Sequence, residues 1–272
     1  MRSIGIFDSG VGGLSVLRSI HQLLPAEPLL YLADQAHVPY GKRPLEEVRA
    51  FSEQIARYLL AEGARLIVVA CNAASAAGLQ HLRQVFPAVP FVGMEPAVKP
   101  AAEQTRSRVV GVLATPATFQ GALYASVVER FANGVSLLQS TCPGLVEQIE
   151  AGDLDGPVTR RILEEALESM LERGIDTVVL GCTHYPFVIP LIEAIVGPGV
   201  RVIDPAPAVA RQAKRLLDER GLRQKGKKAG GVRYVTTGDV QAMQEALRHL
   251  MGERGKVEGV VWVEGEIKPR NH

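Results

Sequence analysis

Two cysteines lie at matching places in two similar segments of the chain. Cys71 falls in residues 66–72 and Cys182 in residues 177–184, and each follows an apolar run rich in β-branched residues. Such a run is typical of a strand buried on both faces of a parallel sheet. Ligands of open α/β sheets bind beyond the carboxyl ends of the strands, so we expect both thiols at the mouth of a crevice. Thiols on opposite sides of one substrate could remove a proton from one face of a carbon and return it to the other.

The sequence also allows other roles for these cysteines. A cysteine in an apolar strand often serves only as a small buried hydrophobic residue. Here Asn72 follows Cys71, and Thr183 and His184 follow Cys182, which supplies the hydrogen-bonding neighbours that a thiolate needs. Cys182 and His184 could also form a hydrolase nucleophile pair or part of a zinc site. A hydrolase would leave Cys71 unexplained, and the cysteines lack the close spacing typical of zinc ligands.

The glycine-rich residues 8–13 follow the first predicted strand and open a helix. They resemble a dinucleotide-binding loop, with Asp34 as its downstream acid. However, Ser15 stands where the third small residue belongs, and Asp8 would place negative charge beside a pyrophosphate. We therefore interpret Asp8 and Ser9 as polar side chains in the same crevice as Cys71. No lysine lies in a setting that favours a Schiff base with pyridoxal phosphate, and the sequence predicts neither a cofactor nor a metal.

Composition narrows the class of protein. The 272 residues are 47% hydrophobic and 22% charged, with a formal net charge of +1. This balance gives no reason to expect nucleic acid or an anionic membrane as a partner. No apolar stretch reaches the ~18 residues of a membrane span, and the first residues do not resemble a signal peptide. The three cysteines contain no CxxC pair, which favours reduced thiols and a cytoplasmic location.

Predicted strands and helices alternate along the chain. Apart from the two cysteine segments, strands are predicted at residues 3–7, 29–34, 91–94, 108–114, 135–139, 201–204, 233–237 and 257–263. Helices are predicted at residues 14–24, 45–61, 73–85, 158–173, 186–195, 205–220 and 240–251, with others starting at residue 116 and before residue 150. The alternation predicts an α/β protein with a parallel sheet in each half. The basic, glycine-rich residues 224–231 are expected to form a solvated loop.

Four motifs resemble the signatures of the bacterial glutamate racemases, a family of cofactor-independent enzymes in the aspartate/glutamate racemase superfamily. They are residues 7–13, 39–41, 70–72 and 181–186, and residues 113–116 also fit. The resemblance implies two pseudo-symmetric domains, each with a mostly parallel sheet flanked by helices, and an active site in the cleft between them. It implies a discontinuous first domain, residues 1–95 plus 207–272, a second domain of residues 96–206, and a homodimer.

The resemblance also implies roles for individual residues. Cys71 and Cys182 would be the proton-transfer thiols, serving D-glutamate and L-glutamate respectively, assisted by Asp8 and His184. Glu150 would lie behind the histidine. The substrate would be bound by Asp8, Ser9, Tyr40, Gly41, Asn72, Ala73, Thr183 and His184. Ala73 departs from the family, which commonly has a threonine or serine there, so one hydroxyl donor is lost.

The predicted function is therefore racemisation of glutamate, which supplies D-glutamate for peptidoglycan. Two alternatives stay open at this level. One is a racemase of aspartate, of a related amino acid or of hydantoins. The other is a catalytically silent amino-acid-binding protein of the same fold, for which the departure at Ala73 is the one hint.

Overall fold

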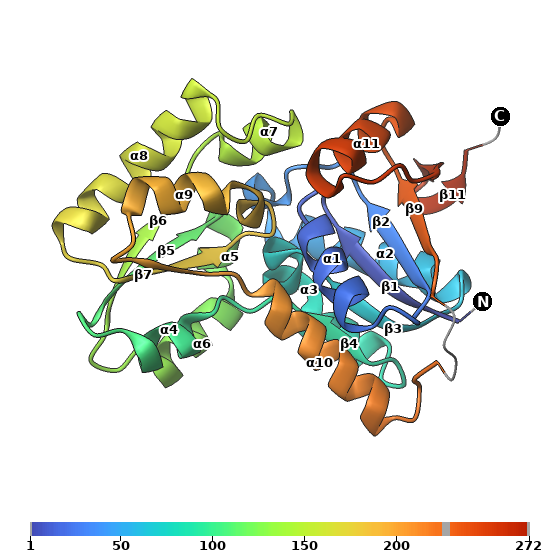
Figure 1. Ribbon diagram of the computed structural model, residues 1–272. Helices are drawn as coiled ribbons and strands as arrows, with labels where there is room; N and C mark the ends of the chain where they lie inside the picture. The colour runs from blue at the N-terminus through green and yellow to red at the C-terminus, as the bar shows by residue number, and fades with distance from the viewer. Residues whose placement is uncertain (1, 225–228, 271–272) are drawn as a thin grey trace.

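The computed structural model describes residues 2–224 and 229–270, and it contains two sheets that lie in two lobes (Figure 1). The larger sheet has the strand order β11-β10-β9-β2-β1-β3-β4. Its strands are β1 (Ser3–Asp8), β2 (Leu29–Ala33), β3 (Ala64–Val69), β4 (Phe91–Gly93), β9 (Val232–Thr236), β10 (Val257–Val263) and β11 (Glu266–Pro269). All pairings are parallel except that of β10 with β11.

The smaller sheet is parallel throughout, with the order β6-β5-β7-β8. Its strands are β5 (Val109–Ala114), β6 (Ser136–Ser140), β7 (Thr177–Gly181) and β8 (Arg201–Ile203). The predicted fold class, two mostly parallel sheets flanked by helices, is thereby confirmed. The larger sheet takes strands from both ends of the chain, because β9 pairs with β2.

Helices cover both faces of each sheet, which is why the central strands are apolar at nearly every position. Ile4 and Ile6 of β1 face a core shared with α1 and α10, whereas Phe7 faces α2 and α3. The helices on the larger sheet are α1 (Leu14–Leu23), α2 (Leu45–Ala61), α3 (Asn72–Val85), α10 (Ala206–Glu219) and α11 (Val240–Ala246). Those on the smaller sheet are α4 (Val98–Gln104), α5 (Pro116–Gln120), α6 (Ala122–Phe131), α7 (Leu145–Glu150), α8 (Pro157–Glu172) and α9 (Ile189–Val196). Short turns of other helix types are η1 (Tyr40–Lys42), η2 (Tyr185–Val188) and η3 (Leu247–Met251).

Three details differ from the elements expected from sequence. Helix α4 and strand β11 were not predicted; β11 forms a hairpin with β10 through Glu264 and Gly265, which both have positive φ, as two-residue hairpin turns require. The helix expected from residue 116 breaks at Gly121. A Cβ there would lie 2.5 Å from the Cβ of Ala76, so the break lets the second lobe approach α3.

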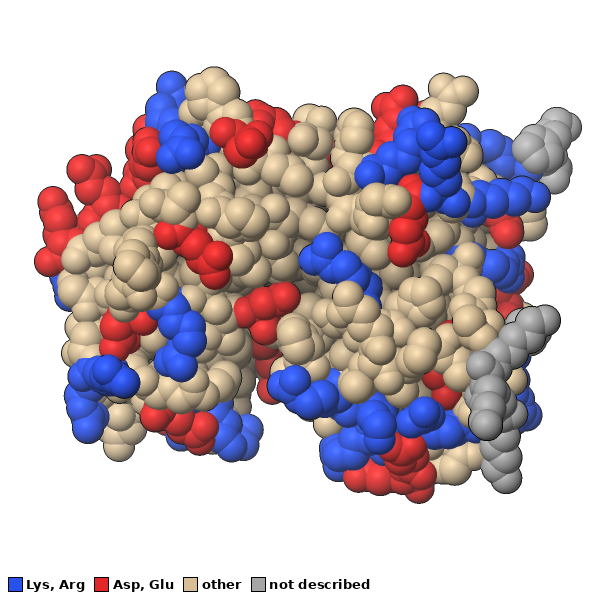
Figure 2. Space-filling model, viewed as in Figure 1, with Lys and Arg blue, Asp and Glu red and all other residues tan. Residues whose placement is uncertain are grey.

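The surface carries charges of both signs. On the face shown in Figure 2, lysine and arginine side chains alternate with aspartate and glutamate over both lobes, and a hollow separates the lobes. Among the described residues, no helix has the length and apolar character needed to span a membrane. Half of the predicted solvated loop at 224–231, residues 225–228, lies outside the described part of the chain.

Candidate active site

A pocket lies between the lobes, where the carboxyl ends of strands from both sheets meet. In the larger sheet, β1 and β3 end side by side, with Phe7 paired to Val69. In the smaller sheet, β5 and β7 end together, with Ala114 paired to Gly181. The residues just after these strands supply much of the wall. The lining is Ser9, Pro39, Tyr40, Gly41, Cys71, Asn72, Ala73, Thr115, Val146, Cys182, Thr183 and His184.

Cys71 forms one wall of the pocket from the larger sheet. It caps the N-terminus of α3, and its Sγ accepts a hydrogen bond from the backbone N–H of Ala74 at 3.4 Å. A thiolate is favoured by such a place, because the helix dipole is positive there. Burial and the nearby carboxylate of Asp8 work in the other direction and raise the pKa of Cys71 well above its ordinary value. Burial and Asp8 together therefore favour the thiol form of Cys71.

Asp8 lies at the end of β1, fully buried behind the lining of the pocket. Its Oδ2 accepts a hydrogen bond from the backbone N–H of Gly13 at 2.7 Å. Burial raises the pKa of Asp8, although the charge of His184 and the bond from Gly13 oppose the shift. A carboxyl group with a raised pKa beside Cys71 is suited to exchange a proton with that thiol.

Cys182 lines the pocket from the smaller sheet and belongs to a chain of three polar side chains. His184 Nδ1 lies 3.8 Å from Cys182 Sγ, and His184 Nε2 lies 2.6 Å from Glu150 Oε1. Burial alone would lower the pKa of His184, but its hydrogen bonds to Cys182 and Glu150 and their negative charges raise it well above the ordinary value. Burial alone would raise the pKa of Glu150, but the hydrogen bond and charge of His184 and the N–H of Val11 lower it. The pair is therefore a carboxylate holding a protonated imidazole.

The glycine-rich loop after β1 packs against this second cluster. A Cβ at Gly10 would lie 2.0 Å from Glu150 Oε1, and one at Gly12 would lie 2.4 Å from His184 Nδ1. The backbone N–H of Val11 donates to Glu150 Oε1 at 2.8 Å. Ser15, the residue that breaks the dinucleotide pattern, shares its hydroxyl proton between the carbonyl oxygens of Gly12 and Thr183 at 2.9 and 3.0 Å. The glycines are thus explained by close approach of the other lobe.

Asn72 is the clearest sign that the pocket receives a polar ligand. Its side chain is 3% exposed, and neither its amide nitrogen nor its amide oxygen has a hydrogen-bond partner among the residues that the structure describes. Buried polar groups are nearly always paired, because an unpaired one costs about 1–3 kcal/mol. A ligand with both donors and acceptors would satisfy this amide.

The loop that follows β2 also contributes to the wall of the pocket. Tyr40 and Gly41 line the pocket, but the Tyr40 hydroxyl donates to Asp34 Oδ2 at 2.5 Å. The backbone of Gly41 lies against the second lobe, since a Cβ there would be 2.6 Å from the Cβ of Thr115. The free space at the centre of the pocket is about 20 Å³, which is room for about one water molecule. An amino acid therefore fits only after the residues that line the pocket have moved.

The structure brings together every residue that the sequence proposed for the site. Ser9, Tyr40, Gly41, Cys71, Asn72, Ala73, Cys182, Thr183 and His184 line the pocket, and Asp8 and Glu150 lie directly behind it. Sequence reasoning assigned no role to Thr115 or Val146. Thr115 follows β5 as Cys182 follows its neighbour β7, which was an available signal; Val146 in α7 carried none.

The third cysteine lies outside the pocket. Cys142 is buried beside Ser140, and burial raises its pKa to about 12, so it stays a thiol. Within residues 2–224 and 229–270, no three histidine, cysteine, aspartate or glutamate side chains are grouped as a metal ion would need. The site therefore contains two thiols, one from each lobe, that line the same pocket. A group that can carry a proton lies beside each thiol.

This chain is similar to known proteins in sequence and in structure. A family described as Asp/Glu/hydantoin racemase matches residues 4–213. The glutamate racemase of Roseiflexus sp. (strain RS-1) is 52% identical over 250 residues, which are 92% of each chain. The crystal structure of glutamate racemase from Thermus thermophilus in complex with β-chloro-D-alanine is 38% identical, with a TM-score of 0.81 over 96% of this chain and 97% of that one. That of the Escherichia coli enzyme with L-glutamate and the activator UDP-MurNAc-Ala is 32% identical, with a TM-score of 0.83 over 97% and 100%.

Proposed function

The chain belongs to the Asp/Glu/hydantoin racemase family, and from this premise we propose that it interconverts L- and D-glutamate by proton transfer between two cysteines. D-glutamate made in this way serves peptidoglycan synthesis. One observation carries the proposal: Cys71 and Cys182 come from different sheets and line the same small pocket. We propose glutamate as the substrate because a glutamate racemase matches almost the whole chain.

In the proposed reaction, L-glutamate meets Cys182 as a thiolate. The Sγ–H bond forms as the Cα–H bond breaks, and the electron pair stays on Cα. Cys71, as a thiol, then gives its proton to the opposite face of the same carbon. D-glutamate leaves a Cys71 thiolate and a Cys182 thiol, and the reverse reaction uses the same two groups in exchanged roles. A second turnover in the same direction requires one proton to move from Cys182 back to Cys71.

The groups behind each thiol are suited to that return of the proton. Asp8 has a raised pKa because it is buried, so it can hold the proton that Cys71 gives up or regains. The pKa of His184 is raised by Cys182 and Glu150, so its imidazole can carry a proton at neutral pH and exchange it with Cys182. The two halves of the site thus reach one function with different proton carriers, a carboxyl group and an imidazole.

The α-proton of an amino acid is very weakly acidic, so the pocket has to stabilise negative charge that develops on the substrate. Aimed hydrogen bonds in a site closed to water do this most effectively. The unpaired amide of Asn72 and the hydroxyl groups of Ser9 and Thr183 are the available side chains in the lining. The same groups would fix the carboxylates and the ammonium group of glutamate. No step needs a cofactor.

The experiment that tests the proposal separates the two thiols. Cys71→Ser and Cys182→Ser should each lose about 10²–10⁴-fold in glutamate racemisation, the usual size of a general acid or base contribution. β-Chloroalanine has a leaving group at Cβ, so elimination from it needs only the first proton abstraction. Cys71→Ser should still eliminate from the L enantiomer, and Cys182→Ser from the D enantiomer.

Three results would contradict this proposal. If both variants preferred the same enantiomer, the thiols would not face opposite sides of one carbon. If the wild-type protein exchanged the α-proton of aspartate in D₂O much faster than that of glutamate, the proposed substrate would be wrong. The proposed mechanism would not be contradicted by that result. A folded wild-type protein that exchanged neither would be a silent binding protein.

Three further statements stay predictions. We propose the domain division into residues 1–95 plus 207–272 and residues 96–206, supported by the strands of the two sheets and by the packing of α10 on α1. Limited proteolysis tests these limits. A homodimer and a cytoplasmic location are the other two, and light scattering and cell fractionation test them.

A further inference from the structure

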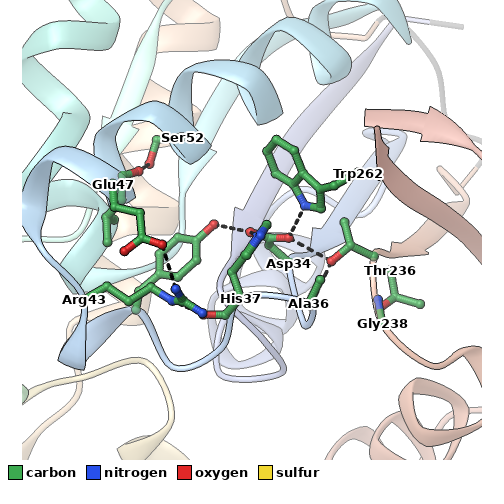
Figure 3. Close-up of polar contacts among 12 residues, drawn as sticks. Asp34, Ala36, His37, Arg43, Glu47, Ser52, Thr236, Gly238 and Trp262 are labelled. Carbon is green, nitrogen blue, oxygen red and sulfur yellow. Dashed lines mark hydrogen bonds and ion pairs between the residues drawn. The ribbon is translucent and has the colours of Figure 1, made fainter. Parts of the chain in front are cut away.

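Asp34 is a fully buried carboxylate that touches neither thiol. It follows β2 and is surrounded by four hydrogen-bond donors. Its Oδ2 accepts from the hydroxyl of Tyr40 at 2.5 Å and lies 2.9 Å from His37 Nδ1. Its Oδ1 accepts from the hydroxyl of Thr237 at 2.8 Å and from the indole Nε1 of Trp262 at 2.7 Å. Figure 3 shows the indole nitrogen of Trp262 directed at Asp34, with His37 close to both.

The two oxygens of this carboxylate serve different parts of the chain. Oδ2 holds Tyr40, which lines the pocket, and His37 three residues before it. Oδ1 holds Thr237, directly after β9, and Trp262 in β10, both more than 200 positions away in sequence. Asp34 therefore connects the C-terminal strands to the loop that forms one wall of the pocket.

Aromatic packing strengthens the same connection. The ring of His37 stacks on Phe51 of α2 with centroids 3.9 Å apart, and Trp262 meets both rings at 5.1 and 5.6 Å. The guanidinium of Arg43 lies 5.7 Å over the Phe51 ring, and its Nε donates to the carbonyl oxygen of His37 at 2.6 Å. These contacts hold both ends of the loop that contains Tyr40.

We infer that Trp262 and Thr237 are positioning residues for the substrate, which act through Asp34 on Tyr40 and so on the pocket wall. The inference rests on the proposed function. The hydroxyl of Tyr40 is bound to Asp34, so the placement of Tyr40 and Gly41 depends on where that carboxylate is held. Once Oδ1 loses a donor, the carboxylate can rotate and the wall loosens, which weakens substrate binding.

The test uses variants that remove one donor and keep the shape. Trp262→Phe keeps a ring against His37 and Phe51, and Thr237→Val keeps the branched side chain. Each should raise the KM for glutamate roughly threefold to tenfold, the size of one weakened hydrogen bond, while kcat changes by less than about twofold. The matched control is Tyr234→Phe in β9, whose hydroxyl donates to the carboxylate of Glu253, away from the pocket.

A purely structural role would behave differently, since it would lower the melting temperature and the active fraction without moving KM. A double mutant separates the routes. If Trp262 acts through Asp34 and Tyr40, then Trp262→Phe should add little to the KM of a Tyr40→Phe variant, which has already lost the last hydrogen bond in the chain. The expected result is that the KM effects of Trp262→Phe and Tyr40→Phe are not additive, and that Tyr234→Phe does not raise KM.

Three outcomes would overturn the inference while leaving glutamate racemisation intact. They are an unchanged KM in both folded single variants, an equal rise in Tyr234→Phe, and a full additional rise in the Tyr40→Phe background. Failure of the proposed function is a separate result, because it would appear as absence of glutamate racemisation in the wild-type protein measured alongside.

Discussion

Gly12→Ala tests the close approach of the two lobes at a single atom. An added Cβ would lie 2.4 Å from His184 Nδ1, whereas ordinary van der Waals contact begins at 3.4 Å, so about 1.0 Å of movement is needed. The backbone at Gly12 does not have positive φ, so alanine is not excluded by conformation. The His184 ring cannot swing away freely, because its Nε2 is held by Glu150 at 2.6 Å.

The expected result is a loss on one side of the reaction. His184 Nδ1 is the atom that faces Cys182, and a misplacement of 1 Å in an active site can cost about 10²-fold in rate. In the proposed mechanism, elimination from β-chloro-L-alanine needs Cys182, so it should fall about hundredfold in Gly12→Ala. Elimination from the D enantiomer needs Cys71 in the same mechanism and should fall much less. Overpacking of this kind also destabilises the fold by about 1–3 kcal/mol.

Two further variants make the measurement decisive. Gly13→Ala places a Cβ 2.7 Å from the Cβ of Asp8, so it should slow the D enantiomer instead. The Cβ added by Gly199→Ala would have no atom of the described residues within 4 Å, so this variant should match the wild type. Rates for each enantiomer are measured on protein shown to be folded by thermal unfolding. Equal losses for both enantiomers in Gly12→Ala, or an unchanged rate for the L enantiomer, would refute the assignment of His184 to the Cys182 side.

Three other predictions follow from the site. Ala73→Thr restores a hydroxyl in the pocket lining and should lower the KM for glutamate by the worth of one hydrogen bond, ~0.5–1.5 kcal/mol; an unchanged KM in a folded variant would mean that position 73 does not face the substrate. In the wild type, the lowered pKa of Glu150 stabilises the fold above the ordinary glutamate value of 4.5, and this stabilisation is lost as pH falls. The raised pKa of His184 stabilises the fold below the ordinary histidine value of 6.5, and this stabilisation is lost as pH rises. Urea unfolding should thus show the greatest deficit of Glu150→Gln between these two pH values, and a deficit independent of pH would contradict the ion pair. Dialysis against EDTA should leave racemisation unchanged, and a loss restored by zinc or pyridoxal phosphate would contradict a site without a metal or cofactor.

The sequence by itself determined the fold class and the two thiols. Alternating apolar runs and amphipathic helices are local patterns, and each cysteine stood at the end of such a run, where α/β proteins bind ligands. The four motifs then indicated the family, and this resemblance named most of the residues that line or back the pocket, though not Thr115 or Val146.

Only the tertiary structure decided how those residues are held. It showed that Gly10 and Gly12 make room for Glu150 and His184, and that the Asn72 amide lacks a partner among the described residues. It also showed that Asp34, which the sequence allowed as a ribose-binding acid, is surrounded by four hydrogen-bond donors. Two of these donors are close to Asp34 in sequence, and the other two lie in or directly after the C-terminal strands. The reason is physical: sequence periodicity records which face of an element is buried, but not which element covers it. Contacts between residues 139 to 228 positions apart are fixed only when both lobes and the C-terminal strands pack together.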